Sequence, residues 1–302
     1  MRLALAMGLA ALLIQPTPPN PASPSPTDIY LVPLSSGLAT MKSSKPVAVS
    51  TAPGYDNQPF FSDDGTRILF AANRDGKQTD VFVFERASGR VTQLTNTATN
   101  ENSPTFMPGA GGAFSVVQSE LDKTQRLWRF DAAGKNPQLI LTDIKPVGYH
   151  AWIDADRVVL FVLGPPATLQ IARVKTGKAE IVATDVGRSL HRIPGTSLAS
   201  FVIHEASGEY WVKQLDVTTR KIEPIVKAAP GSSDRDMAWM PADGSTILMS
   251  GGTKIFSWTR GAAPAAWAEV FDAAAFKLGA ITRLAVSPKG DAVAIVVAEP
   301  AR

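Results

Sequence analysis

The sequence contains no cysteine and only three histidines in 302 residues. Without cysteine, the chain can form neither a disulfide framework nor a thiolate metal site. His150, His191 and His204 form no His-Glu-x-x-His pair, the helical signature of zinc proteases. A Gly-x-Ser-x-Gly elbow, a Walker loop and a dinucleotide-binding glycine motif are also missing. The common signatures of hydrolases and nucleotide-dependent enzymes are therefore absent, and we assign no catalytic residue.

Long runs of one charge are missing as well. The formal net charge is +3 and the isoelectric point about 9.1, with lysine and arginine scattered along the chain. Because nucleic-acid patches need clustered basic residues, we expect no nucleic-acid partner. The composition of 45% hydrophobic and 19% charged residues is typical of a globular chain with a sizeable core. The 23 glycines and 23 prolines indicate many turns.

The N-terminal segment indicates export. A positively charged start, Met1-Arg2, precedes an apolar run at residues 3–14. This run is too short for a transmembrane helix, which needs about 20 residues, but it fits the hydrophobic region of a secretory signal peptide. We predict a signal peptide at 1–22, a Pro/Ser-rich leader at 23–27 and one domain at 28–300. The mature protein is then periplasmic or secreted and has no transmembrane span.

A repeated pattern of short β-rich runs follows. Its clearest unit has an inner strand at 59–61, a hairpin turn at Asp63-Asp64-Gly65, and further strands at 67–72, 81–85 and 91–94. The same order recurs in later runs at 104–109, 113–118, 126–130 and 138–141; 151–156, 157–163, 169–174 and 180–183; 190–195, 198–204, 210–215 and 222–226; 237–244, 246–250, 254–258 and 267–270. The turns lie roughly 45 residues apart, the length of a four-stranded propeller blade.

The last unit stops after two strands: its inner strand ends in a turn at 286–290, and its second strand lies at 292–298. The N-terminus supplies two more strands. Residues 28–33 copy the third-strand pattern of the clearest unit, and 46–50 form a fourth strand. We therefore predict an all-β, six-bladed β-propeller of four-stranded antiparallel blades. Its ring is closed by the N-terminal strands, which complete the C-terminal blade. We expect a monomer, and a short helical turn at 271–278.

The clearest unit resembles a known family. Pro59-x-Phe-Ser-Asp-Asp-Gly-x-x-Ile-x-Phe70, Asn73-Arg-Asp-Gly-x-x-x-Asp-Val-Phe-Val83 and Gly89-x-x-x-Gln-Leu-Thr95 are similar to the WD-like repeat of TolB-type propellers. The same repeat occurs in the propeller domains of prolyl-oligopeptidase-like enzymes, whose catalytic residues lie in a separate domain. The resemblance implies the propeller fold and a periplasmic, protein-binding role. No segment of this sequence matches the N-terminal domain of TolB, so the resemblance does not imply its role in the Tol system.

The candidate site lies where the inner strands begin, because these positions converge on the propeller axis. The candidate ligand- or partner-binding residues are Asn57, Asn102, His150, His191, Asp236 and Arg283, flanked by Asp56, Glu101, Tyr149, Arg188 and residues 234–235. The alternative is structural: the two asparagines satisfy backbone groups between blades, and the aspartates form turns. Phe61, Phe106, Trp152 and Trp239 recur at equivalent places and are predicted to pack between blades.

The favoured hypothesis is a non-enzymatic protein-binding platform in the cell envelope, without a cofactor. The alternative is a metal-dependent hydrolase or lactonase, with a cation held by oxygens of Asp56, Asn57, Glu101, Asn102 and Asp236. Binding of a divalent ion by His150, His191 and Asp236 also remains open. A third hypothesis is a sugar-binding propeller that uses Tyr149 and Tyr210.

Overall fold

The computed structural model describes residues 25–232, 236–242 and 244–299. The predicted signal peptide at 1–22, the start of the leader, Asp234 and residue 300 lie outside this part. The described residues form 24 strands and two short 3₁₀ helices, η1 (Leu38–Ser43) and η2 (Ala273–Phe276). The prediction of an all-β chain is confirmed. Among these residues, neither helix has the length and hydrophobicity required to cross a bilayer.

Most strands belong to four-stranded antiparallel sheets. One sheet comprises β7 (Asn100–Phe106), β8 (Phe114–Ser119), β9 (Gln125–Phe130) and β10 (Gln138–Leu139). The next comprises β11 (Val147–Trp152), β12 (Arg157–Val162), β13 (Thr168–Arg173) and β14 (Lys178–Thr184). A third comprises β15 (Val186–Arg192), β16 (Leu198–His204), β17 (Tyr210–Asp216) and β18 (Ile222–Lys227). A fourth comprises β19 (Met237–Trp239), β20 (Thr246–Gly251), β21 (Lys254–Thr259) and β22 (Ala268–Asp272).

The remaining strands form an eight-stranded sheet with two four-stranded halves. One half comprises β3 (Tyr55–Phe61), β4 (Arg67–Asn73), β5 (Asp80–Glu85) and β6 (Arg90–Gln93). The other, called the closing sheet below, comprises β23 (Ile281–Val286), β24 (Ala292–Ala298), β1 (Thr27–Pro33) and β2 (Val47–Ser50). A single parallel pair, Thr27 with Tyr55, links the two halves.

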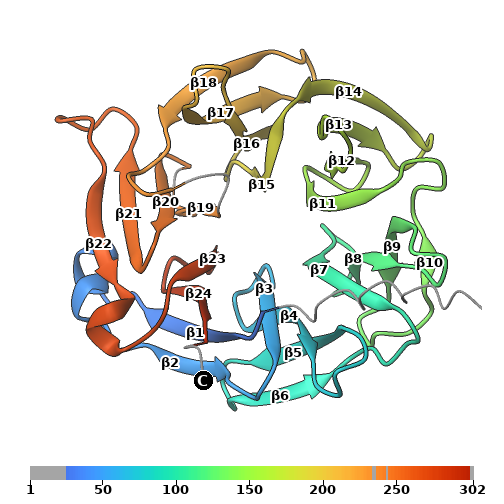
Figure 1. Cartoon of the computed structure of the whole chain (residues 1–302), viewed down its shortest axis with the longest axis horizontal. Coiled ribbons are helices and arrows are strands. Elements are labelled where there is room, and N and C mark those ends of the chain that lie inside the picture. Colours follow the sequence, from blue (N-terminus) through green and yellow to red (C-terminus); the bar gives the residue numbers. More distant parts are fainter. Residues whose placement is uncertain (1–24, 233–235, 243, 300–302) are drawn as a thin grey trace, which may run out of the picture.

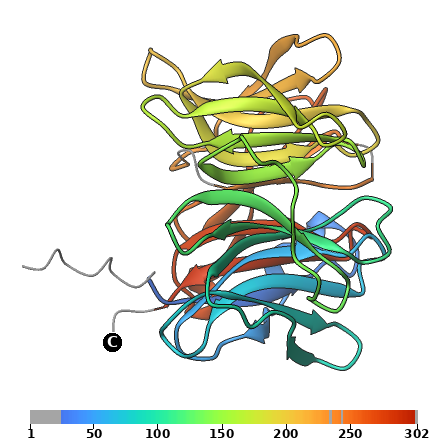
Figure 2. The same cartoon turned by 90° about the vertical axis from the view of Figure 1, so that its right-hand side faces the viewer.

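The sheets are arranged around a central axis (Figure 1). The first strands of the sheets, β3, β7, β11, β15, β19 and β23, lie nearest the centre, and the fourth strands lie at the periphery. Figure 2 shows the same arrangement edge-on, with the C-terminal strands beside the N-terminal ones. Each predicted strand overlaps an observed strand, in the predicted order.

The closing sheet joins the two ends of the described chain. β1 pairs with β24 in antiparallel register along its whole length, from Thr27 opposite Ala298 to Pro33 opposite Ala292. The backbone N–H of Glu299 also donates to the carbonyl oxygen of Pro26 at 3.1 Å. The predicted pairing of N-terminal with C-terminal strands is confirmed. β1 begins at Thr27, one residue before the predicted domain start, because Thr27 already belongs to this ladder.

The core lies between sheets. Along β24, Val293, Ile295 and Val297 pack against the β19–β22 sheet, whereas Ala294 and Val296 pack against β3–β5. Successive side chains of a strand point to opposite faces, so both faces of this sheet are buried. The other apolar clusters likewise lie between neighbouring sheets. This explains why the central strands are continuous hydrophobic runs although the sheets are antiparallel.

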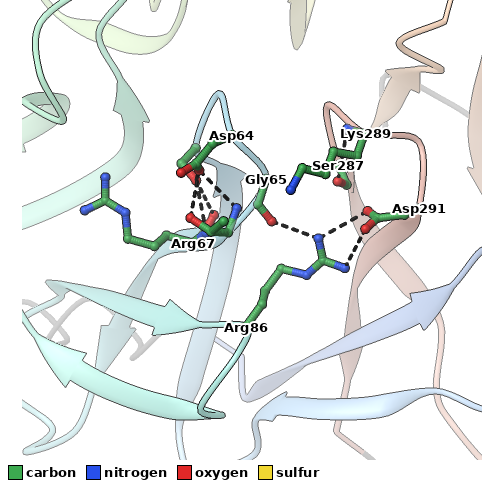
Figure 3. A network of polar contacts seen from close by, with 9 residues as sticks. Asp64, Gly65, Arg67, Arg86, Ser287, Lys289 and Asp291 are labelled. Atoms are coloured by element: carbon green, nitrogen blue, oxygen red, sulfur yellow. Dashed lines mark hydrogen bonds and ion pairs between the residues drawn. The ribbon is translucent and has the colours of Figure 1, made fainter.

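The Ser-Asp-Asp-Gly hairpin of the first repeat shows why the motif has these residues. The Asp64 Oδ1 accepts hydrogen bonds from Ser62 Oγ at 2.6 Å and from the Thr66 backbone N–H at 3.1 Å (Figure 3). These bonds hold the pKa of Asp64 well below its usual range. Gly65 follows with φ of +65°, a conformation that other residues adopt only with strain.

The same hairpin is tied to the closing sheet by Arg86. Its Nη1 donates to the carbonyl oxygen of Gly65 at 2.8 Å and to Asp291 Oδ1 at 3.1 Å, and its Nη2 donates to Asp291 Oδ2 at 3.2 Å (Figure 3). This two-pronged geometry is the strong form of an arginine–carboxylate pair. A Cβ on Gly65 would lie 3.0 Å from Ser287 Oγ, so glycine also permits the close approach of the two hairpins.

One of the two short helices was predicted and the other was not. The predicted turn at 271–278 is η2, which Asp272 caps by accepting a hydrogen bond from the Ala274 backbone N–H. η1, between β1 and β2, was not predicted. It buries Met41 completely in the cluster between the closing sheet and β19–β22.

We predict that a chain beginning at Thr51, which lacks β1, η1 and β2, loses cooperative folding or melts more than about 10 °C lower. β1 alone contributes the fully buried side chains of Ile29 and Val32. Truncation of one such side chain typically costs about 1–5 kcal/mol, against a total stability of about 5–15 kcal/mol. Thermal unfolding followed by circular dichroism measures the effect.

The matched control is a chain beginning at Ser25, which retains the described contacts of Pro26 and Thr27 and should melt like the full chain. If the chain beginning at Thr51 melted at the same temperature as this control, the closing sheet would not be needed for stability.

Candidate functional site

An axial cavity of about 340 Å³ lies among the first strands of the sheets. Its lining includes residues of β3, β7, β11, β15, β19 and β23, together with the turns that follow several of them. Asp63 and Pro288, in two of these turns, are exposed, whereas Asp236 and Arg283 are buried. The cavity therefore has its mouth at the turns and its floor toward the starts of the strands.

Arg283 organises the floor. Its Nε donates to Asn57 Oδ1 at 2.9 Å, and its Nη2 donates to the Tyr149 hydroxyl at 2.9 Å. The guanidinium carbon also lies 5.0 Å from the Tyr149 ring centroid. Since Arg283 is on β23, Asn57 on β3 and Tyr149 on β11, this side chain joins three sheets across the axis. Burial raises the pKa of neighbouring Tyr55 to about 12, so this phenol is uncharged.

Asp236 occupies the other side of the floor. Its Oδ1 accepts from Ser189 Oγ at 3.2 Å, and its Oδ2 accepts from the Leu284 backbone N–H at 3.0 Å. Ser189 Oγ also lies 3.3 Å from His191 Nε2 and accepts from the Met237 backbone N–H at 3.1 Å. This is not the geometry of a catalytic triad, in which the acid orients the histidine rather than the serine. Ser189 is 2% exposed and does not line the cavity.

His150 forms a second serine contact. Its Nε2 lies 2.7 Å from Ser115 Oγ, which also accepts a hydrogen bond from Trp152 Nε1 at 2.8 Å. Burial lowers the pKa of His150 to about 3, so the ring is uncharged near neutral pH. Burial also lowers the pKa of His191, reinforced by the charge of Arg283 and opposed by Asp236. Neither histidine therefore supplies positive charge to the cavity near neutral pH.

The recurrent aromatic residues pack between sheets, as predicted. Phe61, Phe106, Trp152 and Trp239 are all less than 9% exposed. Trp239 Nε1 donates to Ser200 Oγ of the preceding sheet at 2.8 Å, which repeats the contact of Trp152 with Ser115. Their rings contribute to the cavity wall while their indole N–H groups are already paired.

Two of the six candidate residues, Asn57 and Asn102, do not line the cavity. Asn57 Nδ2 donates to Thr27 Oγ1 at 3.3 Å, and Thr79 Oγ1 donates to Asn102 Oδ1 at 3.4 Å. Both bonds join neighbouring sheets, as the structural alternative expected, but their partners are threonine hydroxyls rather than backbone groups. Asn57 still supports the floor through its bond to Arg283. His150, His191, Asp236 and Arg283 line the cavity together.

The carboxylates proposed for a cation lie apart. Asp56 forms an ion pair with Arg74 at 2.5 Å, and burial raises the pKa of Asp56 while this arginine opposes the rise. Glu101, on β7, is buried elsewhere and accepts from Thr95 Oγ1 at 2.9 Å and from Thr97 Oγ1. Within the described residues, no cluster of three or more His, Asp or Glu side chains is placed to hold a metal ion.

Other contributors to the cavity were missed or only partly recognised. Phe60, Arg192 and the turn prolines Pro108, Pro194 and Pro288 line it, and Arg188 was named only as a flanking residue. The recurrence of Pro or Gly in the turns after five of the six inner strands was the available signal for the mouth. Tyr210 of the sugar-binding hypothesis stacks on His204, with ring centroids 4.5 Å apart, and does not join Tyr149 in the cavity lining.

Comparison with known proteins identifies the fold. No protein-family model and no curated protein matches the chain. A solved structure from Agrobacterium tumefaciens assigned as TolB is similar, with a TM-score of 0.71 and 15% identity over 92% of this chain and 99% of that one. TolB from Acinetobacter baumannii has a TM-score of 0.59 and 12% identity over 93% and 66% of the two chains. Oligogalacturonate lyase from Vibrio parahaemolyticus has a TM-score of 0.52 and 14% identity, over 80% of this chain and 88% of that one.

These likenesses show a TolB-like propeller fold, as the sequence resemblance implied. At such low identity they show the fold alone, because one propeller architecture hosts unrelated functions.

The buried carboxyl of Glu101 predicts a pH dependence of stability. Burial raises its pKa from 4.5 to about 7, with a further rise from Asp80 and opposition from the hydroxyls of Thr97 and Thr95. Because the folded protein then holds this proton more tightly than the unfolded chain, the free energy of unfolding should fall as pH rises from about 4.5 to about 7. The loss should reach about 3 kcal/mol at most, and Glu101→Gln should abolish it.

Urea unfolding at pH 5 and pH 8 tests this expectation. Glu101→Gln should be more stable than the parent at pH 8 but not at pH 5. The control is Glu223→Gln, whose exposed carboxyl pairs with Lys221 and has a lowered pKa, so its removal should bring no gain at pH 8. Parallel pH profiles for the parent and Glu101→Gln would show that Glu101 is ionised in the folded protein.

Proposed function

We propose that this TolB-like propeller is an exported, non-enzymatic protein-binding platform of the cell envelope, periplasmic or secreted, with six blades. The axial cavity is its binding site, and a protein partner inserts a side chain or a chain end there. The pairing of β1 with β24 and the packing of each sheet against two neighbours support the six-bladed ring. The charged start and apolar run at residues 1–14 support export.

The observation that carries the binding role is a concave cavity whose serine–histidine contacts are buried. The cavity has the size of a small-ligand site, and Phe60 in its wall is 38% exposed. The serine hydroxyls next to its histidines are buried and hydrogen-bonded, so they are poorly placed to act as nucleophiles. Such a lining favours recognition over bond cleavage.

A matched pair of substitutions tests the binding role. Phe60 in the cavity wall and Val91 on the outer strand β6 are both 38% exposed, so a glutamate at either position should cost the fold little. We expect Phe60→Glu to reduce cross-linking to envelope partners at least about tenfold, because the new charge is desolvated when a partner inserts. Val91→Glu should leave cross-linking unchanged. Equal cross-linking by both variants would contradict a role for the cavity.

The metal-dependent alternative makes a different prediction. On protein purified from its native compartment, we expect EDTA to leave the melting temperature unchanged and elemental analysis to find no stoichiometric divalent ion. A metal that is bound tightly to the folded state would instead stabilise it, and chelation would lower the melting temperature by several degrees. That outcome would favour a hydrolase or lactonase.

A further inference from the structure

Arg188 is a cavity residue whose guanidinium forms few hydrogen bonds with the described residues. It lies on β15 and reaches across the axis to β23, where its Nη2 donates to the carbonyl oxygen of Thr282 at 3.4 Å. A guanidinium carries five N–H donors, and this long bond is weak. The Arg188 Nε is buried and has no hydrogen-bond partner among the described residues. The side chain therefore lies at the floor of the cavity with hydrogen-bonding capacity that the described residues do not use.

The charge of Arg188 is also unpaired within the described residues. The Tyr149 hydroxyl and the Asp236 carboxylate raise the pKa of Arg283, although burial opposes the rise. The ion pairs formed by the described residues include neither Arg283 nor Arg188. Arg283, however, donates hydrogen bonds to the side chains of Asn57 and Tyr149, whereas Arg188 donates the long bond to the Thr282 carbonyl oxygen. Since His150 and His191 are uncharged, the floor has room for one additional negative charge near Arg188.

The walls above Arg188 are largely apolar. Phe60, Trp152 and Trp239 contribute rings, and Pro108, Pro194 and Pro288 line the mouth. The two indole N–H groups are already bonded to Ser115 and Ser200, so the rings offer only apolar surface to a ligand. A ligand that fits this cavity therefore has an apolar body and a single anionic end.

We propose that the cavity binds an aromatic or large aliphatic group that ends in a carboxylate, with the carboxylate paired to Arg188. The planar guanidinium matches a carboxylate in a two-pronged geometry. A phosphate dianion would need a second free cation, but Arg283 already donates to Asn57 and Tyr149. Arg192 is exposed at the end of β15 near the mouth, where its Nε donates to the Thr196 carbonyl oxygen. This chemistry has two sources: a free carboxylic acid, or the C-terminal residue of a partner chain that enters end-on. The inference rests on the proposed use of the cavity as a binding site.

Two pairs of probes test the carboxylate directly on the full mature protein. N-acetylphenylalanine is compared with its amide, and the peptide Gly-Gly-Gly-Phe with its C-terminal amide, by calorimetry and tryptophan fluorescence. Each acid should bind at least about tenfold more tightly than its amide, because a charge-assisted pair is replaced by a neutral contact. 3-Phenylpropionate separates the sources: binding as tight as that of the peptide acid indicates a free acid, and much weaker binding indicates a chain end.

Substitution of Arg188 locates the effect. Arg188→Met should reduce the preference for acid over amide to about one, and Arg188→Lys should leave an intermediate preference because it keeps the charge but loses the planar fork. The control is Arg90→Met: Arg90 lies on the outer strand β6, is exposed and does not line the cavity. It should retain the full preference. If Arg188→Met fails to fold, the probe pairs on the parent protein still test the preference for a carboxylate, and Arg188→Lys still tests whether Arg188 causes it.

Equal binding of acid and amide by the parent, or binding of neither, would overturn the proposal. The failure of this inference is distinguishable from the failure of the proposed function. Equal affinities with cross-linking that is still lost in Phe60→Glu would refute only the carboxylate preference. A clear acid preference with unchanged cross-linking in Phe60→Glu would refute the partner role and leave the ligand chemistry standing.

Discussion

The structure depends on the burial of both faces of the sheets that surround the axis. A strand such as β4 places Ile68 and Phe70 against the closing sheet and Leu69 against the β7–β10 sheet. A sheet with two apolar faces is stable only between two neighbours, since an uncovered face would leave a large apolar surface in water. In a linear stack, the first and last sheets would each keep one such face. The closing sheet removes this problem because it packs against β19–β22 on one side and β3–β5 on the other.

The arrangement around an axis also creates the site. Side chains of the inner strands project toward one another from sheets that are distant in sequence, and the longest of them meet across the centre. Arg283 and Tyr149 are 134 residues apart, and Arg188 and Thr282 are 94 apart. These contacts fill the axis at the starts of the strands and leave the space toward the turns open. The floor of the cavity is thus built from the same side chains that link opposite sheets.

Much of the fold could be predicted from the sequence because the repeat specifies local structure. The Ser-Asp-Asp-Gly hairpin, the alternating strands and the copy of the third strand at residues 28–33 are each encoded within a few residues. η1 was missed because its stability depends on burial of Met41 against a sheet more than 200 residues away.

The site was harder to predict than the fold. Four of the six candidate residues meet in the cavity, but Asn57 and Asn102 turn toward neighbouring sheets instead. Which side of a strand start faces the axis depends on a local bulge, such as the register shift between Asn57 and Phe60, and sequence periodicity does not reveal it.

The pairing of β1 with β24 has a consequence for biosynthesis. Residues 27–33 cannot find their partner until residues 292–298 have been made, so this ladder forms only after the strands between them have been synthesised. Until then, the apolar faces of β3–β5 and of the β19–β22 sheet that the closing sheet covers remain exposed.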